Sequence, residues 1–238
     1  MEPNEILQDV LDFWVSREER PRDGRSGHVI TGPIYVDGAE PGDTLEVEIL
    51  GLQTRVPYGI TTTGPTNGVF VSSYPGTRPD DPVLDILRER HLIRTATVDG
   101  RDVALFSEAI HVPLAPFMGI MGVAPEDPTV GQPGVTVPDV QASRPPGPFG
   151  GNMDVKDLTT GATLYLPVFH PGARFYVGDP HSAQGDGEVS GNAIEQSLTG
   201  IFRFTVHKGE TIVAPRAETD THYIMMGIDL DLDRALRK

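Results

Sequence analysis

The sequence has no cysteine, few basic residues and no long apolar run. Without cysteine, the 238-residue chain has no disulfide, zinc finger, iron–sulfur cluster or cysteine nucleophile. With 19 Lys and Arg against 34 Asp and Glu, the formal net charge is −15, so nucleic acid is not an expected partner. No apolar stretch approaches the roughly 20 residues of a membrane helix, and no membrane partner is expected. The N-terminus shows no signal-peptide pattern, and a cysteine-free chain suits the cytoplasm.

Several hydrolase and nucleotide-binding signatures are also missing. The chain has no Gly-x-Ser-x-Gly elbow, no phosphate-binding loop ending in Gly-Lys and no Rossmann glycine pattern. Lysine occurs only as Lys156, Lys208 and Lys238, and none of them has a serine three residues upstream, so a serine–lysine amidase arrangement has no support. For an enzyme, metal-assisted hydrolysis is the chemistry that remains.

Glycine and proline are abundant, with 27 and 22 residues, which argues against a helical bundle and favours short strands joined by turns. Residues 44–50 alternate apolar and acidic side chains, which predicts a half-buried strand. Asp99-Gly100 separates two apolar runs and predicts a hairpin with a type I′ turn. We therefore expect a mainly β fold, a distorted antiparallel β-sandwich with two or three short helices.

The remaining elements follow from periodicity and turn signals. Helices are predicted at residues 6–14, 82–90 and 230–237, and further strands at 34–36, 93–98, 103–106, 163–169, 173–177, 200–206, 211–213 and 222–228. Residues 17–25 are expected to be an exposed loop, and no regular structure is expected at 51–80. The Pro- and Gly-rich segment 125–151 is long and irregular, which is typical of a functional or disordered loop.

The densest polar segment is 178–188, which contains three carboxylates, one histidine and one glutamine among three glycines. Histidine and carboxylate together are suitable ligands for Zn²⁺ or a similar divalent ion. A second polar segment, 150–154, follows the long irregular stretch. Each segment alone is as consistent with a turn, but together they could supply an open metal site, which His28 could approach. Asp186 and Glu188 would share a face if their segment were an extended strand.

These stretches resemble the acetamidase/formamidase family. The matching segments are residues 31–36, 38–49, 118–125, 150–154 and 164–169, the last continuing into 178–188. The Gly-Gly-Asn-x-Asp and His-x-x-Gln-Gly-Asp-Gly-Glu elements are the specific ones. The resemblance implies a β-rich fold, hydrolysis of small aliphatic carboxamides of the formamide or acetamide type to carboxylate and ammonia, and a homo-oligomer. It also implies a divalent metal, expected to be Zn²⁺, with Ca²⁺ as a possible second ion.

Carried over by motif, the site gathers six residues. We assign Asp154 and His181 to the metal, Asn152 and Gln184 to the substrate, and Glu188 and Asp186 to catalysis, with Asp186 alternatively a third metal ligand and His28 an additional candidate. We expect Glu188 to be the carboxylate that transfers a proton from water to the leaving ammonia.

The family pattern usually includes an N-terminal β segment and a longer C-terminal helical part, and we expect this chain to lack both. We expect a single domain over residues 1–238, with two sub-regions at about 28–124 and 152–229. The alternative to an amidase is a non-catalytic small-molecule or metal-binding β-module without turnover. A structural β-domain that binds no metal is a third interpretation.

Overall fold

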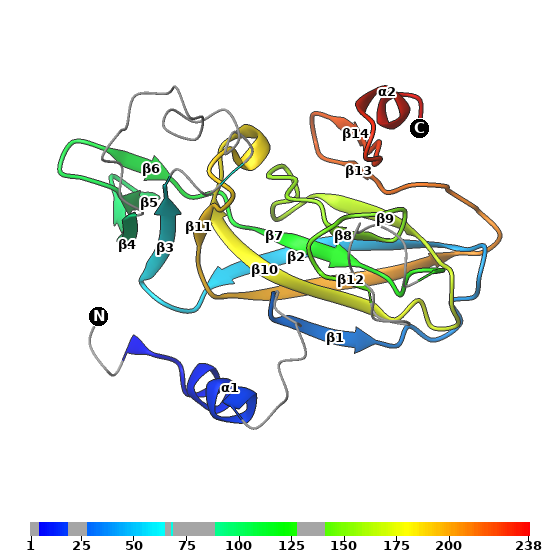
Figure 1. The fold of residues 1–238 in the computed structure, drawn as a ribbon, viewed down its shortest axis with the longest axis horizontal. Coiled ribbons are helices and arrows are strands. Elements are labelled where there is room, and N and C mark those ends of the chain that lie inside the picture. The colour runs from blue at the N-terminus through cyan, green and yellow to red at the C-terminus, as the bar shows by residue number, and fades with distance from the viewer. Residues whose placement is uncertain (1–4, 19–27, 65–67, 69–88, 128–140) are drawn as a thin grey trace, which may run out of the picture.

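The computed structural model describes residues 5–18, 28–64, 68, 89–127 and 141–238. Their strands form two antiparallel sheets, one of nine strands and one of five, which are layered over most of the length of the molecule (Figure 1). This arrangement confirms the mainly β antiparallel fold expected from the sequence.

The larger sheet, here called sheet A, contains the strands that hold most of the polar motifs. Its order is β6 (His111–Pro113), β5 (Arg101–Leu105), β4 (Glu89–Val98), β3 (Tyr58–Thr63), β11 (Ile194–Glu195), β10 (Phe175–Ala183), β7 (Phe117–Gly122) and β8 (Gly150–Asn152), with β1 (Ile30–Ile34) paired to β10. Sheet B has the order β12 (Leu198–His207), β2 (Thr44–Thr54), β9 (Thr163–Pro167), β13 (Arg216–Glu218) and β14 (Tyr223–Met225).

Helices are few in the described part of the chain. They are α1 (Gln8–Glu18), α2 (Leu232–Leu236) and the single 3₁₀ turn η3 (Asp186–Glu188). No helix described here is long and apolar enough to cross a membrane. The helices predicted near the two ends are confirmed, although α1 begins two residues later than predicted and runs on to Glu18.

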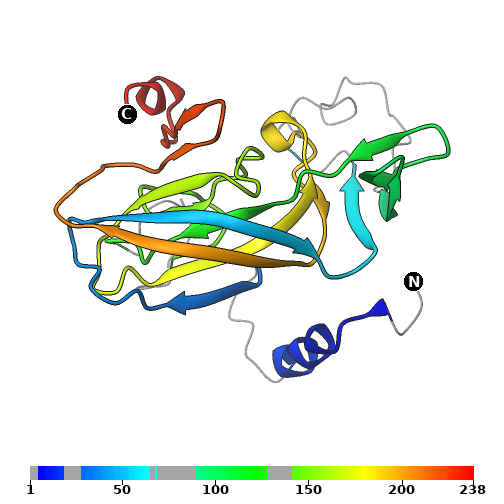
Figure 2. The same cartoon turned by 180° about the vertical axis from the view of Figure 1, so that it is seen from behind.

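The main core lies between the two sheets. Leu45, Val47 and Ile49 point inward from β2 and are fully buried, while the acidic residues between them are only partly buried. Long strands β2 and β12 cover sheet A on this side (Figure 2). The core is completed by buried side chains of β7, β9 and β10 and their loops, including Met121, Leu164, Leu166, Phe175 and Val177. The alternation in β2 therefore predicts the buried face correctly.

Local turn chemistry also gives a correct prediction for the β4–β5 hairpin. Asp99 and Gly100 connect these strands with φ angles of 50° and 75°. Both values lie in the left-handed region that a type I′ turn requires at its two central residues. The hairpin belongs to an arm of sheet A, β3 to β6, which shares a small buried cluster with β10 and β11 (Ile93, Ala104, Ala183 and Ile194).

Other expectations are wrong. In two segments, strands form or continue because distant partners supply their hydrogen bonds, and in one segment a predicted strand is absent. Residues 51–80 were expected to lack regular structure, but within the described part, 51–64 and 68, β2 extends to Thr54 and β3 pairs with β4. The rest of that range lies outside the described residues. β10 continues past residue 177 to Ala183, because β1, β7 and β11 supply its hydrogen bonds. Residues 211–213 form no strand. The predicted helix at 82–90, most of the loop at 17–25 and the centre of the 125–151 segment lie outside the described residues, and Glu89 and Arg90 begin β4.

Candidate functional site

His181 is the centre of the polar cluster in sheet A. Its side chain is fully buried on β10, and its ring meets the edge of Phe117 with ring centroids 5.0 Å apart. The strand register places His181 opposite Phe117 of β7 and opposite Glu195 of β11. A carboxylate and an aromatic ring are therefore brought to the histidine by strands that are distant in the sequence.

The two ring nitrogens of His181 have different neighbours. Nδ1 lies 3.1 Å from Oε1 of Gln184, and Nε2 of Gln184 donates to the backbone carbonyl of Asp154 at 2.8 Å. Because Gln184 uses its NH₂ group on that carbonyl, its Oε1 is the acceptor and Nδ1 of His181 is the donor. This hydrogen bond directs Nε2 of His181 toward the carboxylates.

Nε2 of His181 lies among carboxylates and is buried without a hydrogen-bond partner. Oε2 of Glu195 is 3.1 Å away and Oδ2 of Asp179 is 3.4 Å away. Burial opposes the charged form of His181, but these carboxylates outweigh it and raise the pKa of the imidazole to about 10. The surroundings of Nε2 thus stabilise a positive charge at this point, whether it comes from a proton or from a metal ion.

Two groups of three side chains share His181. In one, ligand atoms of Asp154, His181 and Glu188 lie within 4.8 Å of one another; in the other, those of Asp179, His181 and Glu195 do so. A neutral imidazole nitrogen offers one lone pair, and Nδ1 of His181 is already used on Gln184. His181 can therefore ligate one ion through Nε2, and the remaining carboxylates are available for another task.

One carboxylate oxygen of Asp154 accepts a hydrogen bond, and the other is buried without a partner. Nδ2 of Asn152 donates to its Oδ2 at 2.8 Å, whereas its Oδ1 and Oδ1 of Asn152 are buried without a partner. A Cβ atom on Gly119 of β7 would lie 2.6 Å from Oδ1 of Asp154 and 2.9 Å from Oδ2 of Asp179. Only glycine at this position leaves space between the carboxylates, and the unpartnered buried atoms around it are a donor set that fits a divalent cation.

Backbone conformation is unusual at this cluster. Six described residues other than glycine have positive φ, and three of them are the carboxylates Asp154 (49°), Asp179 (52°) and Glu188 (44°). Such conformations are unfavourable for a side chain, most clearly for glutamate, and persist where the surrounding structure imposes them. The fold thus holds three acidic side chains in strained backbone positions around one histidine.

Burial also raises the pKa of the two carboxylates in the group formed by Asp154, His181 and Glu188. Burial raises the pKa of Asp154 to about 6, with the charge of Asp179 raising it further. Burial and the charge of the neighbouring Asp154 raise the pKa of Glu188 to about 7. A pair of neighbouring carboxylates that hold a proton near neutral pH can accept and return one.

The structure brings together five of the residues predicted from the sequence: Asn152, Asp154, His181, Gln184 and Glu188. His28 lies at the margin, with Nε2 3.7 Å from Oδ2 of Asp179 and Nδ1 3.0 Å from Oγ of Ser143. Asp186 is not brought to the cluster, because its side chain is 91% exposed and its Oδ1 pairs with Nζ of Lys156 at 3.2 Å.

The expectation that Asp186 and Glu188 share a strand face is wrong. Their segment is the 3₁₀ turn η3, and Gly187 between them has φ of 74°, so the two side chains point in different directions. Sequence reasoning assigned no role to Asp179 and Glu195, although Asp179 lies in the polar segment. The only local signal for Glu195 is an acidic residue beside the apolar residues Ala193 and Ile194.

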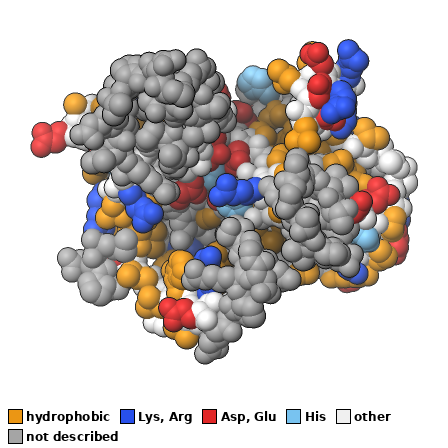
Figure 3. Space-filling view, in the orientation of Figure 1, with side chains coloured by type: hydrophobic (Ala, Val, Ile, Leu, Met, Phe, Trp, Pro, Cys, Tyr) orange, Lys and Arg blue, Asp and Glu red, His pale blue; other side chains and the backbone are white. Residues whose placement is uncertain are grey.

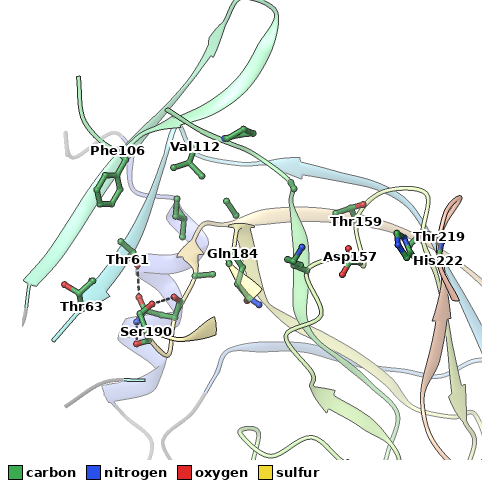
Figure 4. Close-up of a pocket in the computed structure, with 18 of the residues that line it drawn as sticks. Thr61, Thr63, Phe106, Val112, Asp157, Thr159, Gln184, Ser190, Thr219 and His222 are labelled. Carbon is green, nitrogen blue, oxygen red and sulfur yellow. Dashed lines mark hydrogen bonds between the residues drawn. The ribbon is translucent and has the colours of Figure 1, made fainter. Parts of the chain in front are cut away.

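A cleft of about 780 Å³ borders the cluster at Gln184 (Figure 4). Thr61 and Ser190 line one side of Gln184, and Asp157 and Thr159 line the other. Acidic, basic and histidine side chains also meet in a hollow near the middle of the face seen in Figure 3. Small polar molecules could therefore approach the buried cluster from the side of Gln184.

Comparison with known proteins gives consistent matches. The model of the acetamidase/formamidase family matches residues 17–132 and 138–225. An acetamidase of Mycolicibacterium smegmatis is 29% identical over 209 residues, covering 68% of this chain and 49% of that protein. The chain thus spans about half the length of this curated relative.

Two solved structures share the fold. The crystal structure of an acetamidase from Bacillus halodurans has a TM-score of 0.70 and 33% identity, covering 87% of this chain and 61% of that one. An acetamidase structure from Yersinia enterocolitica has a TM-score of 0.71 and 31% identity, with coverage of 88% and 59%.

Proposed function

The chain belongs to the acetamidase/formamidase family, and from this premise we propose that it is a metal-dependent amidohydrolase for small aliphatic carboxamides. The reaction takes an amide and water to a carboxylic acid and ammonia, which at neutral pH are the carboxylate and the ammonium ion. The observation that carries the proposal is the buried Nε2 of His181, which has no hydrogen-bond partner and lies between carboxylates.

We propose that His181 holds a Zn²⁺ ion together with Asp179 and Glu195, whose carboxylate oxygens are the nearest acidic atoms to Nε2. Bound there, the ion would supply Lewis acidity that polarises the amide carbonyl and acidifies water. This assignment keeps His181 from the sequence-based expectation but replaces Asp154, the acidic ligand expected there, with Asp179 and Glu195. In that alternative, the ion lies between Asp154, His181 and Glu188. A second ion such as Ca²⁺ would have to be held by carboxylates without Nε2 of His181.

Glu188 then moves the protons. Its half-buried carboxylate takes a proton from the attacking water and returns it to the leaving nitrogen, which departs as ammonia. Asp154 shares this task as the neighbouring carboxylate of the same group. Asp186 has no part in this scheme, because its side chain is exposed and pairs with Lys156.

Asn152 and Gln184 have different tasks. Oδ1 of Asn152 is buried and unpartnered, so it is available to accept a hydrogen bond from the N–H of a substrate amide. Both polar atoms of Gln184 already have protein partners. We therefore propose Gln184 as a positioning residue that orients His181, and not as a direct contact to the substrate.

The proposal is tested by ammonia release from formamide and acetamide, measured with added Zn²⁺ and after treatment with a chelator. Elemental analysis of the purified protein is the first measurement. Ammonia release that a chelator abolishes and Zn²⁺ restores is the expected result. Bound metal without ammonia release would favour the alternative, a binding module without turnover. Absence of bound metal and of turnover would leave a structural β-domain.

A further inference from the structure

A second pocket beside the cluster contains two arginines. Its volume is about 470 Å³, and its lining includes Ile60, Thr62, Arg90, Arg144 and Glu195. Glu195 also belongs to the group around His181, so the pocket and the proposed metal site share a side chain. Whatever binds next to Arg90 and Arg144 would therefore lie close to the reacting end of a substrate.

The positive charge of this pocket contrasts with the rest of the chain, whose formal net charge is −15. Within the described ranges, neither Arg90 nor Arg144 forms an ion pair, whereas Arg55, just after β2, and Arg94 of β4 pair with Asp9 and Glu5. Glu195 is the acidic residue of the pocket lining, and its Oε2 faces Nε2 of His181 at 3.1 Å. Its charge is therefore balanced by the histidine or an ion, and no acidic residue of the described part of the chain neutralises the two guanidinium groups.

Strand register connects Arg90 to His181 across one face of sheet A. His181 lies opposite Glu195, and Glu195 lies opposite Ile60. Thr62, two residues beyond Ile60, lies opposite Arg90 of β4. Because directly opposed residues and residues two apart share a face of a sheet, Arg90 stands on the same face as His181.

Arg144 also lines the pocket, and the residue before it is held by a hydrogen bond to His28. Oγ of the preceding residue, Ser143, accepts from the backbone N–H of His28 at 3.3 Å and lies 3.0 Å from its Nδ1. Nε2 of His28 is 3.7 Å from Oδ2 of Asp179, which is part of the group around His181. This chain of contacts attaches the backbone at Arg144 to the cluster.

Asn192 lines the pocket and is hydrogen-bonded to the backbone of Thr62, which lines it too. Its Oδ1 accepts from the backbone N–H of Thr62 at 2.6 Å, and its Nδ2 donates to the carbonyl of Thr62 at 2.8 Å. The loop before β11 is thus fixed to β3, and the lining between Arg90 and Glu195 is preorganised. A rigid lining lowers the free-energy cost of ordering a bound ligand.

We propose that this pocket binds a carboxylate at the far end of the substrate, so that the preferred amides are monoamides of short dicarboxylic acids. Guanidinium groups bind carboxylates through paired, charge-assisted hydrogen bonds, and two of them facing one pocket favour an anion over an alkyl group. The inference rests on the proposed function for its reaction, while anion binding at the pocket can be measured without turnover.

The test compares two amides of nearly equal shape. Succinamate carries a carboxylate where 4-methylpentanamide carries an isopropyl group. We expect the parent protein to hydrolyse succinamate with a kcat/KM at least about tenfold higher, because charge-assisted hydrogen bonds to a carboxylate are about twice as strong as neutral ones. Arg90→Gln and Arg144→Gln should each lower kcat/KM for succinamate by about tenfold or more and leave that for 4-methylpentanamide within about twofold.

Arg101→Gln is the matched control, because Arg101 is an exposed arginine of β5 that does not line the pocket. Equal kcat/KM for the two amides, or equal losses in all three variants, would overturn the pocket assignment while leaving the amidase proposal intact. If neither of these amides is hydrolysed, and formamide and acetamide are not hydrolysed either, the proposed function fails. Calorimetric titration of succinamate then decides the pocket alone. Binding that both Arg→Gln variants abolish supports the inference, and binding that is absent or unchanged in the variants contradicts it.

Discussion

At the scale of single residues, the site depends on the contrast between the two nitrogens of His181. Gln184 occupies Nδ1, and carboxylates lie next to Nε2 without forming a hydrogen bond to it. A buried nitrogen without a hydrogen-bond partner is costly, and the acidic groups beside Nε2 favour a cation that would compensate it. Metal binding at Nε2 would replace a proton there, which is why the same surroundings suit both the protonated and the metal-loaded histidine.

The proposed roles of Glu188 in proton transfer and of Glu195 in metal binding can be tested by replacing each residue separately. Glu188→Gln removes a proton carrier but keeps its shape, so we expect metal content within about twofold of the parent and a rate loss of at least ~10²-fold. Glu195→Gln removes a proposed ligand and should lower metal content about tenfold or more. Elemental analysis and ammonia release are measured on both variants.

The reverse pattern would reassign the ion. Metal loss in Glu188→Gln with full occupancy in Glu195→Gln would place the ion with Asp154 and Glu188, and Glu195 would then be a candidate for the proton carrier. Parental rates in Glu188→Gln would remove it from proton transfer altogether.

Gly119 provides a second test at residue scale. Its missing side chain leaves the space between Asp154 and Asp179, and an alanine Cβ would come within 2.6 Å of Oδ1 of Asp154. Gly119→Ala should force these carboxylates apart, lower metal content and activity at least about tenfold, and cost about 1–3 kcal/mol of stability through overpacking. Gly51→Ala on β2 is the control, because its Cβ would meet Ile201 at an ordinary 3.7 Å. Equal metal content and activity in the two variants would contradict the role given to Gly119.

At the scale of elements, the site is a product of strand pairing. β10 carries Asp179 and His181, β11 carries Glu195, and the segment after β8 carries Asp154. No single segment supplies more than part of either group. The antiparallel register of sheet A therefore determines which acidic side chains reach the histidine.

The turn before β2 has an acidic residue whose role is purely structural. Oδ2 of Asp43 accepts from Nζ of Lys208 at 2.7 Å and from the backbone N–H of Glu40 at 2.8 Å, and Oδ1 accepts from the N–H of Gly209 at 2.9 Å. These contacts, led by Lys208, lower the pKa of Asp43 to about 2. The carboxylate thereby joins this turn to the turn after β12.

This coupling predicts a pH-dependent contribution to stability. Because the pKa of Asp43 is lower in the folded state than its usual ~3.9, the contribution is complete above about pH 5 and is lost as the pH falls toward 2. Asp43→Asn should cost about 1–3 kcal/mol at pH 7, and progressively less below pH 4. Urea unfolding from pH 7 to pH 3, in chelator, measures the difference. Asp37→Asn, an exposed neighbour, is the control, and a pH-independent difference for Asp43→Asn would contradict the prediction.

Local patterns in the sequence predict some elements well. The alternation in β2 and the Asp99-Gly100 turn are fixed by neighbouring residues, and both predictions are confirmed. β3 and the second half of β10 contain turn-forming residues and become strands only because distant partners satisfy their hydrogen bonds. The site follows the same rule. Motif residues such as His181 are visible in the sequence, whereas Glu195 is recognised only once the register places it opposite.

At the scale of the whole molecule, sheet edges and exposed apolar side chains favour association. Sheet B ends at β14, which has one neighbour, β13, among the described strands. Tyr223 and Met225 on β14 are 86% and 76% exposed. An unprotected edge strand with apolar side chains can pair with another chain, and proteins usually cover or charge such edges.

We therefore expect a homo-oligomer in which β14 is covered by a second copy. Light scattering at micromolar concentration should give a multiple of 25.7 kDa. Met225→Lys, which places a charge on this edge, should shift the mass toward the monomer, because lysine on an edge strand opposes further pairing. Ile201→Lys on β12, at the opposite edge of sheet B, is the matched comparison. A parent protein that runs as a clean monomer would refute the oligomer. Dissociation by Ile201→Lys alone would move the contact to β12.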